Sequence, residues 1–428
     1  MKRIVALLTR QKQEAGMSFR FLTLGAVAAL FATGLVAAWA VPPGAGGGEE
    51  CLTLVAIGEA GENNGVLRGC GTYITNMHTG QHDAGKFDLL FFLGDMFGPT
   101  GLNVPVGDVQ KKVQVMLEPF RGPLDDLGRE HVHSIAGEHD YYARNAIEGT
   151  LLLGLVKIEE APIGLTDRGN RREAAMSAWT HHYGLPSEAV YPLAPRSEDS
   201  VQFIFFDSAI PLRTPSGAWT PALDGLRGIL AGDRARPHIL WRIFCAHHPF
   251  MSAGEHAGYT AWDDESDTVE YVPPCDRDSN ASGWIRNSLD PEDLCASRYR
   301  ALVDSVRRAI RGGGVKVQLA LSGHDHSLQL LSAPAGGGAG DPFPSVQVIS
   351  GAASEPARVR FPSPPFLFTS AMMTPSDKGE SLPGFVRIAF TKERCTVVFY
   401  NGNNGDPIDM GGGRKEFHIG ADGVLTGN

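Results

Sequence analysis

The sequence lacks several patterns that would place it in a common class of proteins. Its six cysteines include no C-x-x-C pair, which argues against a zinc ribbon or a thioredoxin-type redox site. There is no G-x-S-x-G elbow of an α/β-hydrolase and no Gly-rich phosphate loop ending in Lys-Ser or Lys-Thr. We find no marked Lys/Arg cluster outside the N-terminal leader, and the net charge is −10, so no nucleic-acid partner is expected.

The chain does contain enough apolar sequence for a sizeable core. It has 428 residues, 43% of them hydrophobic, and this length would allow more than one domain. Apolar runs recur along the whole sequence, so the 52 glycines and 28 prolines indicate many turns and loops rather than disorder.

The N-terminus carries a targeting pattern. Residues 21–41 have no charged side chain, a run long enough to cross a bilayer. Basic residues precede this run and acidic residues follow it, which predicts a cytoplasmic N-terminus and export of the rest. Residues 1–40 are therefore either a signal peptide cleaved after Ala38-Trp39-Ala40 or a membrane anchor, and residues 41–50 are a Pro/Gly-rich linker. We expect a periplasmic, extracellular or lumenal protein whose only membrane contact is this segment.

The cysteines predict disulfide bonds in such a compartment. All six follow the N-terminal segment, and their even number favours pairing under oxidising conditions. Cys275 and Cys295 flank a polar stretch and are the first candidate pair. Cys245 lies inside an apolar run and is expected to remain a buried thiol.

Strand and helix patterns alternate before a late hairpin. Apolar runs predict buried strands at 52–57, 89–93, 201–206, 239–246 and 315–322. Helices are expected at 298–311 and after an N-cap at Asp108, and a hairpin at 385–390 and 395–400. This order predicts a mixed α/β fold. We expect one domain at 51–415, with a polar insertion at 259–298 and a C-terminal tail at 416–428.

Four short segments end apolar runs with side chains of the kind that bind metals. They are Gly94-Asp95, Gly137-Glu138-His139-Asp140, His247-His248-Pro249 and Gly323-His324-Asp325-His326. Three of them follow a predicted strand, and the carboxyl ends of neighbouring strands line one crevice in α/β folds. Converging carboxylates and imidazoles are what a two-metal hydrolytic site needs. The alternative for each segment is a solvated polar loop or a core histidine with ordinary partners.

The residue types suggest individual roles. A single carboxylate at Asp95 can bridge two cations, and Glu138 can ligate one of them. His139 can hydrogen-bond a substrate or protonate a leaving group, because imidazole titrates near neutral pH. The remaining candidates are Asp140 to orient an imidazole, one of His247 and His248 to bind metal, and His256 to contact the substrate or the ligands.

The order of these segments resembles the calcineurin-like metallophosphoesterase superfamily, and more narrowly the tartrate-resistant, mammalian-type purple acid phosphatases. The similarity runs from about Leu52 to about Asp406. Its best stretches are 93–101, 136–140, 246–249 with 255–256, 321–326 and 348–352. The resemblance implies a four-layer α/β sandwich of two mixed sheets flanked by helices. It also implies a two-metal site that activates water for in-line attack on the phosphorus of a phosphate ester.

Carried over by position, the resemblance assigns ligands to both metals. The first metal would be held by Glu59, Asp95 and His326, with Asp95 as the bridge, and the second by Glu138, His247 and His324. His139 and His256 would contact the phosphate and the leaving group. Asp140, His248 and Asp325 would support these side chains without binding metal.

Three positions depart from the family pattern. The first-motif Asp of the family is Glu59 here, its Tyr ligand is Gly98, and its third-motif Asn is Glu138. Without a tyrosinate, a purple ferric centre is not expected. The three carboxylates still carry about −3 in charge when ionised, which suits two divalent cations of the Fe, Zn or Mn type.

Two functions therefore stay open at this point. One is an exported metal-dependent phosphoesterase that acts on a phosphorylated small molecule or another phosphoester. The intact Gly-His-Asp-His segment and the metal-type side chain of Glu138 favour it. The other is a pseudophosphatase, a binding or scaffold module on the same fold, and the changes at positions 59, 98 and 138 favour it.

Overall fold

The computed structural model describes residues 51–97, 113–141, 185–213, 216–254, 256, 261–263, 268–270, 292–294, 296–332, 344–357, 367–369, 373–374, 377–378 and 381–426. The N-terminal segment and linker, Asp108, Gly98 and the expected Cys275–Cys295 pair lie outside these residues. Of the helices that are described, none combines the length and the apolar character needed to cross a bilayer.

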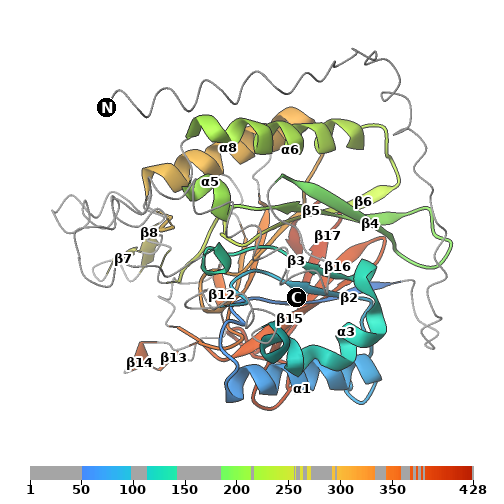
Figure 1. Cartoon of the computed structure of the whole chain (residues 1–428), viewed down its shortest axis with the longest axis vertical. Coiled ribbons are helices and arrows are strands. Elements are labelled where there is room, and N and C mark those ends of the chain that lie inside the picture. Colours follow the sequence, from blue (N-terminus) through green and yellow to red (C-terminus); the bar gives the residue numbers. More distant parts are fainter. Residues whose placement is uncertain are drawn as a thin grey trace, which may run out of the picture. The chain divides into compact units, whose positions relative to one another are not determined.

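Two seven-stranded mixed sheets form the centre of the fold (Figure 1). The first has the order β18-β17-β16-β15-β1-β2-β3, and the second has the order β12-β10-β11-β9-β6-β5-β4. In the first sheet, β1 pairs in parallel with β2 and antiparallel with β15. In the second, β6 pairs in parallel with β5 and β9, whereas β4 is antiparallel to β5.

The bounds of the strands are as follows. The first sheet contains β1 (Leu52–Ile57), β2 (Leu89–Phe92), β3 (Val132–Ser134), β15 (Gly384–Phe390), β16 (Arg394–Asn401), β17 (Phe417–Gly420) and β18 (Leu425–Thr426). The second contains β4 (Ser187–Pro192), β5 (Ser200–Phe206), β6 (Ile239–Ala246), β9 (Leu319–Ser322), β10 (Leu328–Ser332), β11 (Val346–Ser350) and β12 (Leu367–Thr369). Two short hairpins are β7 (Ala261–Asp263) with β8 (Thr268–Glu270), and β13 (Met373–Thr374) with β14 (Asp377–Lys378).

Helices cover the outer face of each sheet, so the layers run helix, sheet, sheet, helix (Figure 1). Helix α1 (Gly65–Thr79) starts at an N-cap on Asn64 and packs Leu67 and Ile74 on the first sheet, beside α3 (Arg121–Leu127). Helices α6 (Thr220–Asp233) and α8 (Ser297–Gly313) pack together on the second sheet. The short helix α5 (Ala209–Arg213) follows β5 and touches α8.

The central strands are buried on both faces. In β1, Leu54 and Ala56 point into the core between the sheets, whereas Val55 and Ile57 join the core under α1. Side chains alternate along a strand, so a strand buried on both faces reads as one continuous apolar run. This is why β1 and β6 have the bounds that their sequences predict. The four-layer α/β sandwich is confirmed.

Two boundaries differ from the expectation. Residues 417–426 are not a separate tail, because β17 pairs with β16 and its Phe417 and Ile419 are buried in the core between the sheets. The helix expected at 298–311 extends from Ser297 to Gly313, so it includes the last residues assigned to the polar insertion. Cys245 is a fully buried thiol as predicted, and burial raises its pKa.

Candidate metal centre

Ligand-type side chains from both sheets meet at one edge of the sandwich. In the first sheet β1, β2 and β3 lead into Glu59, Asp95 and Glu138, and in the second β6 and β9 lead into His247 and His324. The carboxyl ends of parallel strands share an edge of their sheet, so residues far apart in sequence converge here. All five are at most 4% exposed.

His247 lies at the centre of this group. Its Nε2 is 2.8 Å from Oε2 of Glu138, 3.6 Å from Oδ2 of Asp95 and 3.7 Å from Oε1 of Glu59. Its Nδ1 is 2.7 Å from the carbonyl oxygen of Leu93, which only accepts, so Nδ1 donates and Nε2 faces the carboxylates. Because Leu93 follows β2 and His247 follows β6, this bond also ties the two sheets together.

The other predicted ligands flank His247. Nδ1 of His324 is 3.1 Å from Oε1 of Glu138. The backbone N–H of His324 donates to Oε1 of Glu59 at 2.7 Å, and Nε2 of His326 is 3.4 Å from Oε2 of Glu59. The structure thus brings all six predicted metal ligands into one cluster.

The two histidines expected to contact the substrate border this cluster. Nε2 of His139 is 3.7 Å from Oδ2 of Asp95, and the His139 side chain is 30% exposed. The ring of His256 lies 4.6 Å from the ring of His324, centroid to centroid. The backbone N–H of His256 donates to Oδ1 of Asp325 at 3.1 Å, which fixes this segment beside the cluster.

Asp140 accepts hydrogen bonds from backbone N–H groups rather than from the imidazole that the sequence suggested. Its carboxylate accepts the backbone N–H groups of Asp95 at 3.0 Å, Phe97 at 3.2 Å and Gly137 at 2.9 Å. Buried backbone donors outside strands need such partners. Asp140 therefore fixes the loop after β2 against the loop after β3. Oδ1 of Asp95 adds to this by accepting the N–H of His139 at 2.8 Å.

Three ligand candidates have a backbone conformation that L-residues rarely adopt. Their φ angles are 56° for Glu59, 52° for Asp95 and 67° for His324. Within the described ranges, Arg196 is the only other non-glycine residue with a positive φ. Such conformations cost on the order of 1–3 kcal/mol each and concentrate at functional sites. Their occurrence on three converging side chains indicates a site shaped for a ligand.

Two glycines permit the close approach of the loops. A Cβ on Gly94, where φ is 97°, would lie 2.2 Å from Nδ1 of His247. A Cβ on Gly137 would lie 2.0 Å from Oδ1 of Asp95. Any larger residue at either position would displace a ligand candidate.

Crowding gives the cluster unusual proton affinities. Burial, and then the charges of Asp95 and Glu138, raise the pKa of Glu59 well above its usual value, and burial and Glu138 do the same for Asp95. Burial also opposes ionisation of Glu138, but the positive charges of His324 and His247 outweigh it and hold that pKa well below its usual value. Against its own burial, His324 has its pKa raised to about 9 by Glu138. Without a cation, bound protons offset the crowded negative charge.

The donor set fits metal cations. Within the described residues, three overlapping groups place donor atoms within 4.8 Å of one another: Glu138, His247, His248 and His324; Glu59, Asp95 and His247; and Asp95, Glu138 and His139. The buried Nε2 atoms of His247 and His248 and the Oε2 atom of Glu138 have no hydrogen-bond partner. Nε2 of His247 and Oε2 of Glu138 lie 2.8 Å apart but form no hydrogen bond with each other. Two ligands of one cation lie at a similar spacing without a hydrogen bond between them.

Sequence patterns did not reveal the groups that hydrogen-bond to the second ring nitrogen of each imidazole. Ser208 Oγ is 2.8 Å from Nδ1 of His248. The carbonyl oxygens of Glu292 and Glu355 accept from Nε2 of His324 at 3.1 Å and from Nδ1 of His326 at 2.8 Å. Two of these three partners are backbone atoms, which any residue supplies, so no motif marks them.

Comparison with known proteins yields structural matches alone. No protein-family model matches the sequence, and no curated protein matches it. The fold is similar to that of GAP50, the anchor in the inner membrane complex of Plasmodium, with 12% identity, a TM-score of 0.46 and coverage of 85% of this chain and 90% of that one. A purple acid phosphatase from yellow lupin seeds matches with 13% identity, a TM-score of 0.47 and coverage of 86% and 54%, so this chain spans about half of it. A dimetal phosphatase from Danio rerio matches with 12% identity, a TM-score of 0.37 and coverage of 84% and 99%.

The layers and the position of the cluster define the architecture. Two mixed sheets are enclosed by helices, and the carboxyl ends of their parallel strands carry the converging carboxylates and imidazoles. The described residues therefore form a four-layer α/β sandwich with a cluster of metal-type side chains at one edge. Glu59 and Glu138, the two carboxylates at which the sequence departs from the purple acid phosphatase pattern, are both buried inside the cluster.

Proposed function

We propose that this protein is an exported, metal-dependent hydrolase of phosphate esters. The observation that carries the proposal is that the buried atoms Nε2 of His247 and Oε2 of Glu138 lie 2.8 Å apart beside Asp95 and Glu59, yet neither makes a hydrogen bond. Burying such groups without partners is costly unless a ligand compensates them. A divalent cation is the ligand that both an imidazole and a carboxylate accept.

Two cations would share this cluster. Glu59, Asp95 and His326 would hold one and Glu138, His247 and His324 the other, with Asp95 between them. When bound, such cations polarise phosphoryl oxygens and make a water more acidic at neutral pH. The chain itself supplies the fixed positions of these donors, through the backbone bonds of Asp140 and the strained loops after β1, β2 and β9.

The substrate would approach from the side of His139 and His326. A surface pocket there is lined by Glu59, Gly61, Glu62, Asp95, His139, His326, Ser354 and Glu355. His139 is the more exposed of the imidazoles near Asp95, so it is placed to hydrogen-bond a phosphate or to protonate a leaving group. We propose the same general role for His256, which lies beside His324.

Export follows from the N-terminal sequence. The uncharged run at 21–41, with basic residues before it, would direct the chain across a membrane, either as a cleaved signal or as an anchor. The catalytic domain would then comprise the two sheets from β1 to β18 and lie outside the cytoplasm. A phosphoester that is available in that compartment would be the substrate.

One observation favours a second function, that of a pseudophosphatase that binds a ligand without hydrolysing it. Oε1 of Glu59 already accepts the N–H of His324 at 2.7 Å, so this longer carboxylate is partly engaged in holding a loop. If the first metal is lost for this reason, the fold would retain a single cation without the paired arrangement that hydrolysis requires.

The test is hydrolysis of a panel of phosphate esters by the metal-loaded full-length protein and by Asp95→Asn. We expect saturable hydrolysis that falls at least about 100-fold in the variant, because misplacing a bridging ligand by an ångström has that effect. The control is Asp126→Asn on the exposed side of α3, which should leave the rate unchanged. A single bound cation with no hydrolysis of any ester would instead support the pseudophosphatase.

A further inference from the structure

His248 lies inside the ligand cluster, although the sequence placed it beside the ligands as a supporting residue. Its Nε2 is 3.4 Å from Oε2 of Glu138 and has no hydrogen-bond partner, and the residue is 2% exposed. Its ring lies 4.4 Å from the ring of His324 and 4.9 Å from that of His247, centroid to centroid. Three imidazoles and one carboxylate thus face a single space.

The spacings between the Glu138 carboxylate and the three imidazole nitrogens are close to those in a four-coordinate site. Tetrahedral Zn²⁺ with nitrogen and oxygen ligands at about 2.0–2.1 Å sets its donors ~3.3 Å apart. The carboxylate oxygens of Glu138 lie 2.8 Å from Nε2 of His247, 3.4 Å from Nε2 of His248 and 3.1 Å from Nδ1 of His324. These three distances bracket the tetrahedral value.

Each imidazole is also held by its other nitrogen. Nδ1 of His247 bonds to the carbonyl oxygen of Leu93, and Nε2 of His324 bonds to that of Glu292. Nδ1 of His248 is hydrogen-bonded to Ser208 Oγ at 2.8 Å, and the backbone N–H of His248 donates to the same oxygen at 3.1 Å. Metal-binding histidines almost always donate their second N–H to an oxygen in this way, which fixes the tautomer and the ring.

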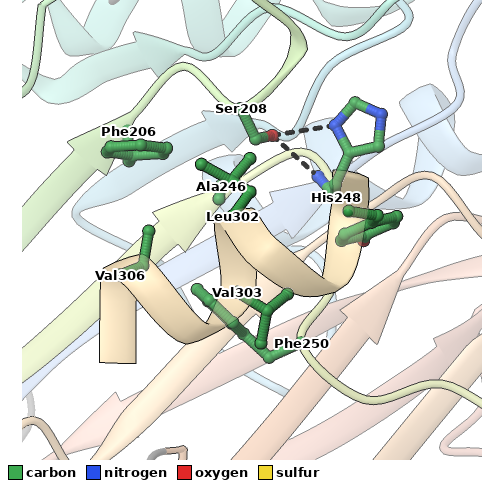
Figure 2. A pocket seen from close by; sticks show the side chains of 9 residues that line it. Phe206, Ser208, Ala246, His248, Phe250, Leu302, Val303 and Val306 are labelled. Atoms are coloured by element: carbon green, nitrogen blue, oxygen red, sulfur yellow. Dashed lines mark hydrogen bonds between the residues drawn. The ribbon is translucent and has the colours of Figure 1, made fainter. Parts of the chain in front are cut away.

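The pocket between β5, β6 and α8 shows how the chain aims His248. Figure 2 shows both bonds from Ser208, with the second ring nitrogen of His248 on the side away from Ser208. The ring of Tyr299 packs edge-on against that of His248 at 5.7 Å, and the Tyr299 hydroxyl donates to the carbonyl oxygen of Pro249. With Nδ1 beside Ser208, Nε2 of His248 lies 3.4 Å from Oε2 of Glu138 in the cluster.

We propose that His248 is a fourth protein ligand, that Glu138, His247, His248 and His324 form a closed site for one Zn²⁺-type cation, and that Asp95 then binds the outer cation alone instead of bridging the two. All four side chains are buried, so this inner cation has no open position toward solvent. His326 and His139, in contrast, are 28% and 30% exposed and border the surface pocket. Any substrate therefore meets the outer cation at Glu59, Asp95 and His326, and the inner cation holds the two sheets together. The closed site does not depend on the proposed hydrolysis.

The test replaces the cations of the full-length protein with Co²⁺ and records its visible absorption, which is much stronger in four-coordinate than in six-coordinate sites. We expect a strong four-coordinate spectrum from one tightly held Co²⁺ per chain. His248→Ala should weaken this absorption and lower the affinity at least about tenfold. Ser208→Ala, which removes the support but no ligand, should lower the affinity about 10–100-fold while the spectrum keeps its four-coordinate form.

The controls separate this site from the outer one and from the fold. His326→Ala should remove the second cation and leave the spectrum intact. His133→Gln changes a buried histidine that packs on Phe91, away from the cluster, and should change nothing in the spectrum. If His248→Ala does not fold, His248→Gln, which keeps most of the side-chain volume, gives the same readout.

An unchanged spectrum and affinity in the folded His248 variant would overturn the proposal. A strong spectrum in a protein that hydrolyses no ester would leave the closed site standing and remove the proposed hydrolase function.

Discussion

At the scale of single residues, the position of Asp95 depends on the absence of a side chain at Gly137. A Cβ at this position would meet Oδ1 of Asp95 at 2.0 Å and its backbone nitrogen at 2.6 Å. Asp95 cannot move aside easily, because Asp140 holds its N–H and its φ is already 52°. The position of this candidate metal ligand is thus fixed by the lack of a side chain at Gly137 and by backbone hydrogen bonds.

We therefore expect Gly137→Ala to lose one or both cations while most of the fold is retained. Elemental analysis of the purified variant measures the loss, and its thermal unfolding midpoint reports on the fold. Gly228→Ala is the matched control, since this exposed glycine of α6 has open space around it and no positive φ. The control should stabilise the protein by about 0.5–1 kcal/mol. Full metal content in Gly137→Ala would contradict this account of Asp95.

The side chains that converge at this edge could be proposed as ligands from the sequence, whereas the shape of the site could not. Asp95, Glu138 and His324 follow apolar runs, and the ends of such runs are known places for ligands. The second nitrogen of each imidazole, in contrast, bonds to groups that become neighbours on folding, such as Ser208 and the carbonyl of Glu292. For the same reason, the sequence could not show that Asp140 would bind backbone donors.

At the scale of elements, predictability follows the pattern of burial. Strands β1 and β6 are buried on both faces and are apolar except for Thr53 and Arg242, so their ends could be predicted. Helix α1 was not predicted, because its buried side consists of few apolar residues among glycines and polar residues. Strand β17 has two buried apolar residues, Phe417 and Ile419, and its strand conformation depends on pairing with β16.

One contact between elements controls the inner part of the site. Arg213, at the end of α5, donates to Oε1 of Glu292 through Nε at 2.9 Å and through Nη2. The side chains are 17% and 15% exposed. The carbonyl of Glu292 accepts from His324, so the ion pair fixes the acceptor that orients a ligand. Arg213 is thus a positioning residue that acts through Glu292.

Removing Arg213 should leave the Glu292 carboxylate mostly buried and near Glu138, without the positive charge of Arg213 beside it. We expect Arg213→Gln to cost roughly 2 kcal/mol in the free energy of unfolding, less than for a fully buried pair because some exposure remains. Its metal affinity should fall as well, and Arg213→Gln with Glu292→Gln should recover part of the stability. Denaturant unfolding and metal titration measure both effects. Arg227→Gln, which breaks the exposed pair with Asp224, should cost less than about 0.5 kcal/mol. Equal costs for the two variants would show that Arg213 has no special role.

At the scale of the whole molecule, the site is the junction of the two sheets. Glu59, Asp95 and Glu138 belong to the loops of one sheet, and His247 and His324 belong to those of the other. A bound cation would therefore join the two sheets across the sandwich. Ligands that bind only the folded state stabilise it, by about 2.7 kcal/mol at a free concentration 100 times the Kd.

This stabilisation should depend on pH in a defined direction. Burial and mutual repulsion raise the pKa values of Glu59 and Asp95, and Glu138 raises that of His324 to about 9 against burial. The metal-free protein consequently holds protons that a cation must displace. Metal affinity, and the rise in unfolding midpoint that metal produces, should then decrease steadily as the pH is lowered from about 9.

Calorimetric titration with Zn²⁺ in two buffers of different ionisation enthalpy measures the protons released on binding. We expect net proton release at neutral pH, because His324 is still protonated there in the metal-free protein and must bind metal as the neutral imidazole. Circular dichroism at each pH separates metal loss from acid unfolding. The contrary result is that binding releases no protons and the affinity is constant between pH 9 and pH 6. The cation would then displace no protons from the carboxylates or from His324, and the ligand assignment would fail as a whole.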